Sequence, residues 1–173
     1  MHSDFPPTDD YFVYFDPSRP STFLDAIDQL GKFILSNGPY DGVIAYSHGA
    51  QLVVPMLARL LVRHPTSQRF KGATFFSGGT PFDFDVTSNR QHLNHIDPLK
   101  TGILLNFPTA NIWGQNDQQY PGTSQILSMI SRPEWCTEFV HSSGHGIPRP
   151  RDQQDVQGCM KAIRRTIGLA LVA

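Results

Sequence analysis

The stretch "GPYDGVIAYSHGAQ", residues 38–51, places a serine between a run of strand-forming residues and a run of helix-forming residues. The run "GVIAY" at residues 42–46 has no polar alternation, which is typical of a strand buried on both faces. Residues 49–63 predict a helix, although Pro55 falls inside it and should kink it. Ser47 therefore lies on an expected strand-to-helix turn, where it is either a nucleophile or an ordinary loop serine.

Strands and helices alternate along the rest of the chain. Further strands are expected at residues 11–15, 109–114 and 136–140, and a strand with its turn at residues 72–79, because these runs are rich in β-branched and aromatic residues. Helices are expected after Thr22, which can cap the first one, within residues 123–131, and along the apolar stripe from Val156 to Ile167, with a short one near residues 90–95. This alternation predicts an α/β fold with a mostly parallel sheet of about five strands and helices on both faces.

Composition limits the class of protein. A length of 173 residues favours one domain over residues 1–173, with residues 1–10 irregular. The net charge is −1 without any block of like charges, so the sequence indicates neither a nucleic-acid partner nor an anionic membrane. The N-terminus does not resemble a signal peptide, and the apolar tail "IGLALVA" is too short to span a bilayer. Cys136 and Cys159 lie outside any metal-ligand spacing, which favours a reduced, cytoplasmic setting without a metal.

Three polar segments follow expected strands and supply a hydroxyl, a carboxylate and an imidazole in the order Ser47, Asp117, His145. The carboxyl ends of parallel strands meet at one edge of the sheet, so these side chains can converge there. A serine hydroxyl needs a base to take its proton, and a carboxylate on the other imidazole nitrogen orients that base. The N–H of His48, at the start of the expected helix, points toward the position of a developing oxyanion.

Each residue also has an ordinary structural interpretation. A small-x-Ser-x-Gly match is weak alone, an Asp after a strand is often a turn residue, and a His in "SGHG" can be a loop residue. His141, at the end of the last expected strand, is a rival base, while Cys136 is expected to belong to the core. The order of the three segments favours catalysis. Pocket walls are expected from Tyr46, the side chain of His48, Gly49, and residues 80–108 and 118–122.

The quoted stretch resembles the nucleophile segment of FSH-type serine hydrolases, typically G-P-F-D-G-V-L-G-F-S-Q-G-A. "IWGQND" at residues 112–117 resembles their acidic segment, and "HSSGHGIP" at residues 141–148 resembles their H-x-G-G-H-x-x-P. The resemblance runs from about residue 11 to the C-terminus. It implies an α/β-hydrolase fold without metal or organic cofactor, with Ser47 as nucleophile, Asp117 as orienting acid and His145 as base. Members of this family include esterases and thioesterases, among them fungal enzymes that release polyketides from carrier domains.

This sequence departs from the family pattern in several places. Ala45, His48 and Ser143 replace a glycine, a glutamine and a glycine. The family also begins with a strand ending in H-G, whose loop supplies a second oxyanion-hole N–H, and the given sequence begins after it, so it looks N-terminally shortened. Three alternatives are open. Residues 11–15 move into the vacant place, a second copy covers the exposed edge in a homodimer, or the chain is incomplete.

Three functions remain open at this stage. The first is hydrolysis of a small ester, thioester or polyketide-like compound through an acyl-Ser47 intermediate. The second uses His145 for proton transfer in an isomerisation, cyclisation or retro-aldol cleavage, because losing one oxyanion donor typically slows acyl transfer by about 10²–10³-fold. The third is a degenerate scaffold that only binds a ligand.

Overall fold

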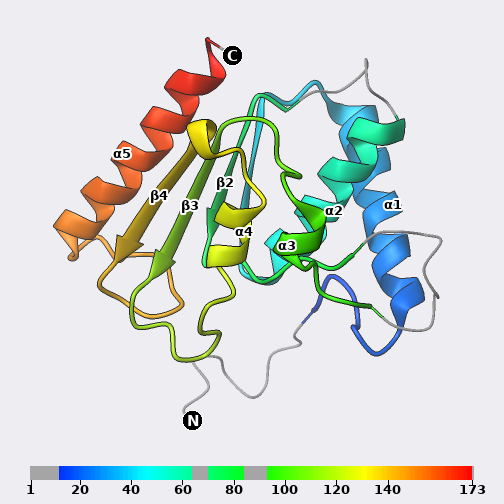
Figure 1. The fold of residues 1–173 in the computed structure, drawn as a ribbon, viewed down its shortest axis with the longest axis horizontal. Coiled ribbons are helices and arrows are strands. Elements are labelled where there is room, and N and C mark those ends of the chain that lie inside the picture. Colours follow the sequence, from blue (N-terminus) through cyan, green and yellow to red (C-terminus); the bar gives the residue numbers. More distant parts are fainter. Residues whose placement is uncertain (1–11, 64–69, 84–92, 173) are drawn as a thin grey trace.

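The computed structural model describes residues 12–63, 70–83 and 93–172. Within them, four strands form one sheet in the order β1 (Gly42–Tyr46), β2 (Gly72–Phe76), β3 (Thr109–Gly114) and β4 (Cys136–His141). All neighbouring strands are parallel, so their carboxyl ends lie at the same edge (Figure 1). The predicted parallel α/β architecture is therefore confirmed, with four strands among the described residues where about five were expected.

Helices cover both faces of this sheet (Figure 1). On one face, α2 (His48–Arg63) packs against β1 and α1 (Pro20–Asn37) packs against α2. On the other face, α5 (Gln153–Ala170) packs against β2, β3 and β4. The short helices α3 (Pro98–Thr101), α4 (Gln125–Met129) and the 3₁₀ turn Pro133–Trp135 lie in the connections.

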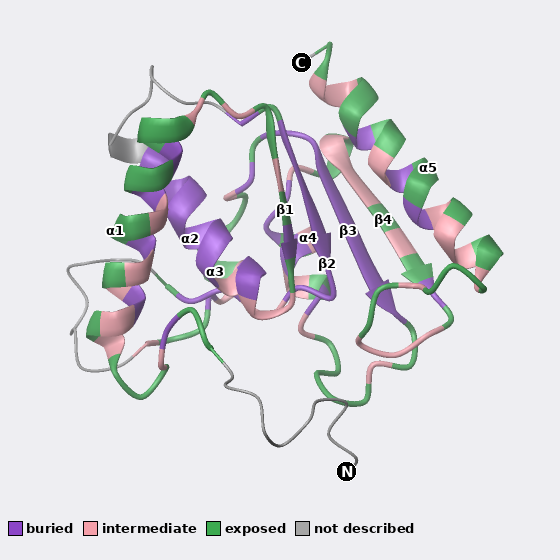
Figure 2. Cartoon of the chain, turned by 180° about the vertical axis from the view of Figure 1, so that it is seen from behind, coloured by how far each residue is buried: buried purple, intermediate pink, exposed green. Residues whose placement is uncertain are grey.

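A hydrophobic core lies on each side of the sheet. The larger core joins α1 and α2 to the sheet through side chains such as Phe23, Val54 and Phe75, which have essentially no exposed surface. The smaller core lies under α5 and includes Ile112 and Cys159. Figure 2 shows that β2 and β3 are buried along their length, as expected for strands covered on both faces. The central strands thus form a rigid platform for the loops at their carboxyl ends.

The first helix begins earlier than the sequence predicts. Pro20 occupies its first turn, where the missing N–H of proline costs nothing, and Arg19 precedes it without a side-chain cap. Thr22, the expected cap, lies inside the helix. Its hydroxyl oxygen accepts a hydrogen bond from the Asp16 N–H at 2.9 Å and its O–H donates to the Arg19 carbonyl at 2.8 Å. Thr22 therefore fastens the turn before α1 instead of starting the helix.

The strand predicted at residues 11–15 is wrong over residues 12–15. These residues form no strand, because no neighbouring strand pairs with them, and a pairing surface is what stabilises a strand. Phe15 is buried against Phe23, whereas Phe12, Val13 and Tyr14 are exposed. Among the described residues β1 pairs only with β2, so it is an edge strand, and Ile44 on it is 70% exposed.

Two other expectations fall partly or wholly outside the described residues. Residues 1–10, expected to be irregular, are outside them, as are residues 90–92 of the short helix expected near residues 90–95. Residues 93–95 are not helical, and His95 instead forms an isolated antiparallel bridge with Phe82. Across the described part of the chain, none of the helices combines the length and the apolar character needed to cross a membrane.

Candidate active site

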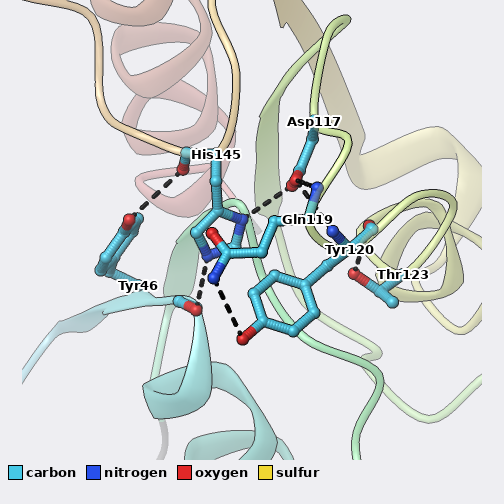
Figure 3. Close-up of polar contacts among 7 residues, drawn as sticks. Tyr46, Asp117, Gln119, Tyr120, Thr123 and His145 are labelled. Atoms are coloured by element: carbon cyan, nitrogen blue, oxygen red, sulfur yellow. Dashed lines mark hydrogen bonds and ion pairs between the residues drawn. The ribbon is translucent and has the colours of Figure 1, made fainter. Parts of the chain in front are cut away.

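The structure brings Ser47, His145 and Asp117 together at the carboxyl edge of the sheet. Ser47 follows β1, Asp117 follows β3 and His145 follows β4. The Ser47 hydroxyl lies 2.7 Å from His145 Nε2, and His145 Nδ1 lies 2.7 Å from Asp117 Oδ2. Figure 3 shows the imidazole pointing toward the Asp117 carboxylate. The three side chains form one continuous hydrogen-bonded chain, although they are 98 and 28 residues apart in sequence.

Ser47 occupies a sharp turn with a left-handed backbone. Its φ is 49°, which a non-glycine residue rarely adopts and which costs about 1–2 kcal/mol. Three hydrogen bonds hold it there. The Ser47 N–H donates to the Phe76 carbonyl at 2.9 Å, and the Ser47 carbonyl accepts from the N–H groups of Ala50 at 3.0 Å and Gly79 at 3.1 Å. The turn therefore holds the Ser47 hydroxyl at the carboxyl edge of the sheet, where Ser47 is partly exposed to solvent.

The helix after Ser47 tolerates the alanine that replaces the first glycine of the family pattern. A Cβ placed on Gly49 would meet Ala45 Cβ and Tyr14 Cε2 at 3.8 Å each, which is ordinary contact. Gly49 itself is buried, so it supports the turn and does not line an open pocket. His48 is the first residue of α2, where its N–H has no helical acceptor.

The side chain of His48 turns away from His145, toward the segment before α1. Its ring centroid lies 4.4 Å from that of Phe15 and 5.7 Å from that of Tyr14. Burial among these rings lowers the pKa of His48. A neutral imidazole is therefore favoured at this position, where it packs against the rings of Phe15 and Tyr14.

Asp117 is held in place from its own loop. Its Oδ1 accepts hydrogen bonds from the N–H groups of Gln119 at 3.1 Å and Tyr120 at 3.0 Å, while Oδ2 faces His145. Burial of the carboxylate, which is 8% exposed, raises its pKa, but the hydrogen bonds from His145 and the two N–H groups outweigh burial and leave the pKa below its usual value. Asp117 is therefore an oriented carboxylate at neutral pH.

The loops that carry Asp117 and His145 are tied to each other and to α5. The Asn116 side chain donates to the Ser142 carbonyl at 2.8 Å, and the Gln115 N–H donates to the His141 carbonyl at 2.8 Å. On the other side, Asp155 of α5 accepts from the N–H and the hydroxyl of Ser142, at 3.1 and 2.6 Å. These contacts set the height of His145 above the sheet.

His141, the rival base, does not reach Ser47. It ends β4, is 1% exposed, and neither ring nitrogen has a hydrogen-bond partner among the described residues. Burial lowers its pKa, against smaller opposing effects of Asp155 and Asp117. Cys136, expected in the core, is half-buried and receives a hydrogen bond from the Asn111 amide at 3.3 Å.

Two tyrosines flank His145, and only Tyr46 was predicted individually from the sequence as a residue of the pocket. The Tyr46 ring centroid lies 5.5 Å from that of His145 and the Tyr120 centroid 4.9 Å from it (Figure 3). Tyr46 was expected at the pocket, whereas Tyr120 was only part of the expected wall at residues 118–122. The N–H groups of Gln119 and Tyr120, and the Ser142–Asp155 tether, were not predicted, because their signal is a loop conformation and not a residue pattern.

The arrangement supports proton transfer from an alcohol to an imidazole. Ser47 can lose its proton to His145 Nε2, and Asp117 holds the Nδ1–H tautomer that this transfer requires. Among the described residues no group of three or more His, Cys, Asp or Glu side chains is placed to bind a metal ion.

Known proteins share this fold and sequence pattern. The chain is 27% identical to esterase FPY3 of Fusarium mangiferae over 165 residues, covering 95% of this chain and 73% of that protein. It is also 27% identical to hydrolase phiM of a fungal species over 126 residues, covering 71% of this chain and 57% of that protein. The chain therefore spans between about half and three quarters of these relatives' length.

Solved structures with the same fold include a lipase and a thioesterase. A monoacylglycerol lipase of Paleococcus ferrophilus superposes with a TM-score of 0.55 at 12% identity, covering 83% of this chain and 76% of the lipase. An acyl-protein thioesterase 2 of Zea mays gives 0.52 at 16% identity, covering 88% and 72%. These similarities establish the α/β-hydrolase fold. The model of the family described as serine hydrolase (FSH1) matches residues 5–157, most of the chain. The chain belongs to the FSH1 family of serine hydrolases.

Proposed function

We propose that the protein hydrolyses a small ester or thioester through an acyl intermediate on Ser47. The observation that carries this proposal is the hydrogen-bonded chain from Ser47 through His145 to Asp117, with both contacts at 2.7 Å. Membership of a serine hydrolase family, and relatives named as esterases, support the same reaction class. In this proposal Ser47 is the nucleophile, His145 the base and Asp117 the orienting acid.

The reaction has two halves. First, Ser47 Oγ forms a bond to the substrate carbonyl carbon while its proton passes to His145 Nε2. The bond from that carbon to the alcohol or thiol then breaks, and His145 returns the proton to this leaving group. In the second half, His145 takes a proton from water as the water oxygen attacks the acyl carbon. The bond to Ser47 Oγ breaks, Ser47 regains a proton from His145, and the carboxylic acid leaves.

The developing oxyanion has one proposed donor on this chain. The N–H of His48 lies in the first turn of α2, where the helix offers it no carbonyl, and the positive end of the helix dipole favours an anion there. Removal of one oxyanion donor typically lowers turnover by about 10²–10³-fold, so this N–H is proposed to contribute a large part of the stabilisation of the oxyanion.

The finer substrate class rests on the relatives. We propose a carbonyl compound of secondary, polyketide-type metabolism, as the resemblance to FSH-type hydrolases implies. The contact between Ser47 and His145 also fits a second candidate, in which His145 transfers protons in an isomerisation, cyclisation or retro-aldol cleavage and Ser47 only donates a hydrogen bond. The reach of His145 to Ser47 argues against a scaffold that only binds.

A fluorophosphonate probe tests the proposal. We expect stoichiometric labelling that maps to Ser47, loss of labelling in Ser47→Ala, and full labelling in the matched variant Ser36→Ala, whose serine is exposed near the end of α1. Hydrolysis of short p-nitrophenyl esters should be lost in Ser47→Ala and kept in Ser36→Ala. Labelling elsewhere, or none, would contradict the acyl-serine route. Turnover that persists in Ser47→Ala but disappears in His145→Ala would support the proton-transfer candidate.

A homodimer stays a prediction and is supported by the outer edge of β1, with which no described strand pairs and where strands of two copies could pair. Ile44→Lys places a charge on this edge, and light scattering of both proteins over a concentration series measures the effect. A wild-type mass that stays monomeric at all concentrations would contradict the dimer. A cytoplasmic setting also stays a prediction, supported by the free thiols Cys136 and Cys159.

A further inference from the structure

The ring of His145 is enclosed by aromatic side chains from two separate elements. Tyr46 is the last residue of β1, and Tyr120 lies in the loop after β3. Figure 3 shows the imidazole lying between the two phenol rings. The rings are tilted against the imidazole by 48° for Tyr46 and 55° for Tyr120. Both tyrosines are about half exposed, 43% and 46%, so neither is needed to fill the core.

We propose that Tyr46 and Tyr120 are positioning residues that bracket His145, hold its ring in line with Ser47, and stabilise the imidazolium formed during each half of the reaction. This inference rests on the proposed function. Both rings lie within about 6 Å of the imidazole, the range in which an aromatic quadrupole attracts a cation. The same two rings limit rotation of the imidazole away from Ser47, which it contacts through Nε2.

The rings, and not the hydroxyl groups, carry the proposed effect. The Tyr46 hydroxyl reaches the His145 carbonyl at 3.4 Å, and the Gln119 amide reaches the Tyr120 hydroxyl at 3.5 Å. Both contacts are at the long limit of a hydrogen bond and contribute little. Burial, followed by the negative charge of Asp117 and by Tyr120, raises the pKa of Tyr46. Tyr46 therefore stays a neutral phenol, and its ring presents no ionised oxygen to the base.

The bracket is fixed by the elements that carry it. Tyr120 donates its N–H to Asp117 Oδ1 at 3.0 Å, and its carbonyl accepts from the Thr123 hydroxyl at 3.1 Å, so its backbone is tied to the carboxylate that orients His145. Tyr46 directly precedes Ser47 and pairs with Phe76 of β2. Asp117 contacts the His145 ring through Nδ1, and the two tyrosines lie against it. The His48 ring lies instead against Phe15.

Substitution by phenylalanine and by leucine separates the rings from the hydroxyl groups. Tyr→Phe at either position keeps the quadrupole, so we expect kcat within about 2-fold of wild type. Tyr→Leu keeps apolar bulk but removes the quadrupole, so we expect kcat to fall about 2- to 5-fold at each position and about 4- to 25-fold in the double variant, with KM within about 2-fold.

The controls keep failure of this inference apart from failure of the proposed function. Tyr40→Leu is the matched variant, since Tyr40 stacks on Phe33 away from the site and its loss should leave kcat unchanged. Fluorophosphonate titration counts competent Ser47 sites in every sample, so kcat refers to folded protein. If the wild type is not labelled, the proposed function fails. If it is labelled and the leucine variants match wild type, raise only KM, or lose no more than the phenylalanine variants, the bracket is refuted. Should the leucine variants not fold, Tyr→Met at the same positions replaces them with the same expected values.

Discussion

Replacing Asp117 by asparagine should lower turnover by several orders of magnitude, because it reverses the tautomer of His145. Asp117 Oδ1 accepts two backbone N–H groups, from Gln119 at 3.1 Å and Tyr120 at 3.0 Å. Asparagine has only one side-chain acceptor, so its oxygen must take this position and its NH₂ must face His145 Nδ1. The imidazole would then accept at Nδ1 and carry its proton on Nε2, the nitrogen that lies 2.7 Å from the Ser47 hydroxyl. A protonated Nε2 cannot take the serine proton.

The expected loss of kcat has a simple origin. To restore the productive tautomer of His145, the asparagine amide would have to flip and point its NH₂ at the two backbone N–H groups. In serine hydrolases with the same arrangement, the wrong tautomer lowers kcat by about 10⁴-fold. We expect about 10³–10⁴-fold here, and we expect Asp117→Asn to be no more active than Asp117→Ala, since alanine leaves the tautomer free while asparagine opposes it. KM should change little, because Asp117 orients the base.

Steady-state hydrolysis of a p-nitrophenyl ester, with fluorophosphonate labelling rates as an independent measure, tests this reasoning. The matched control is Asp25→Asn, an exposed aspartate on α1, which should keep wild-type activity. Asp117→Asn that keeps more than about a tenth of wild-type kcat, or that exceeds Asp117→Ala by more than about tenfold, would refute the tautomer argument.

Other substitutions test the turn, the loop and the carboxylate. Ser47→Gly removes the side chain from a residue with φ of 49°, so it should unfold about 2–4 °C higher than the equally inactive Ser47→Ala, measured by calorimetry. Gly114→Ala would drive a Cβ into the carbonyls of Gly144 and Ser143, so it should displace His145 and cost about 10²-fold in kcat. Gly168→Ala, with no neighbour within 4 Å, is its control and should keep wild-type activity; if both variants match wild type, the clash argument is wrong. The pKa of Asp117 is lowered on folding, so its contribution to stability is full above its unfolded pKa and is lost as pH falls through the folded value. As pH falls below about 4, the free energy of unfolding measured in urea should therefore drop more for wild type than for Asp117→Asn.

The strand runs at residues 42–46 and 109–114 predicted the bounds of β1 and β3. The expected burial on both faces holds for β3 but is wrong for β1, because no described strand pairs with its outer edge and Ile44 is exposed. The same reasoning failed at residues 12–15, because aromatic and β-branched residues favour a strand only where another strand is available to pair. The start of α1 was also missed, since Pro20 sets it and the Thr22 hydroxyl serves the preceding turn.

The convergence of Ser47, Asp117 and His145 was predictable from their order after parallel strands, because the carboxyl ends of such strands share one edge. Their supporting contacts were not. The two N–H groups on Asp117 and the Tyr120 ring depend on the path of a loop that has no periodic pattern. The hydrogen bond from Ser142 to Asp155 joins the loop after β4 to the first turn of α5. It could not be predicted, because the sequence did not indicate where α5 begins.

That tether connects the loop that carries His145 to the first turn of α5. Asp155 lies in the first turn of α5, and terminal turns fray more easily than helix interiors. If the first turn of α5 melts on warming, the hydrogen bonds from Ser142 are released and the His145 loop can drift while the sheet stays intact. Heat inactivation would then set in below the temperature at which circular dichroism reports loss of helix, and brief cooling would restore the rate.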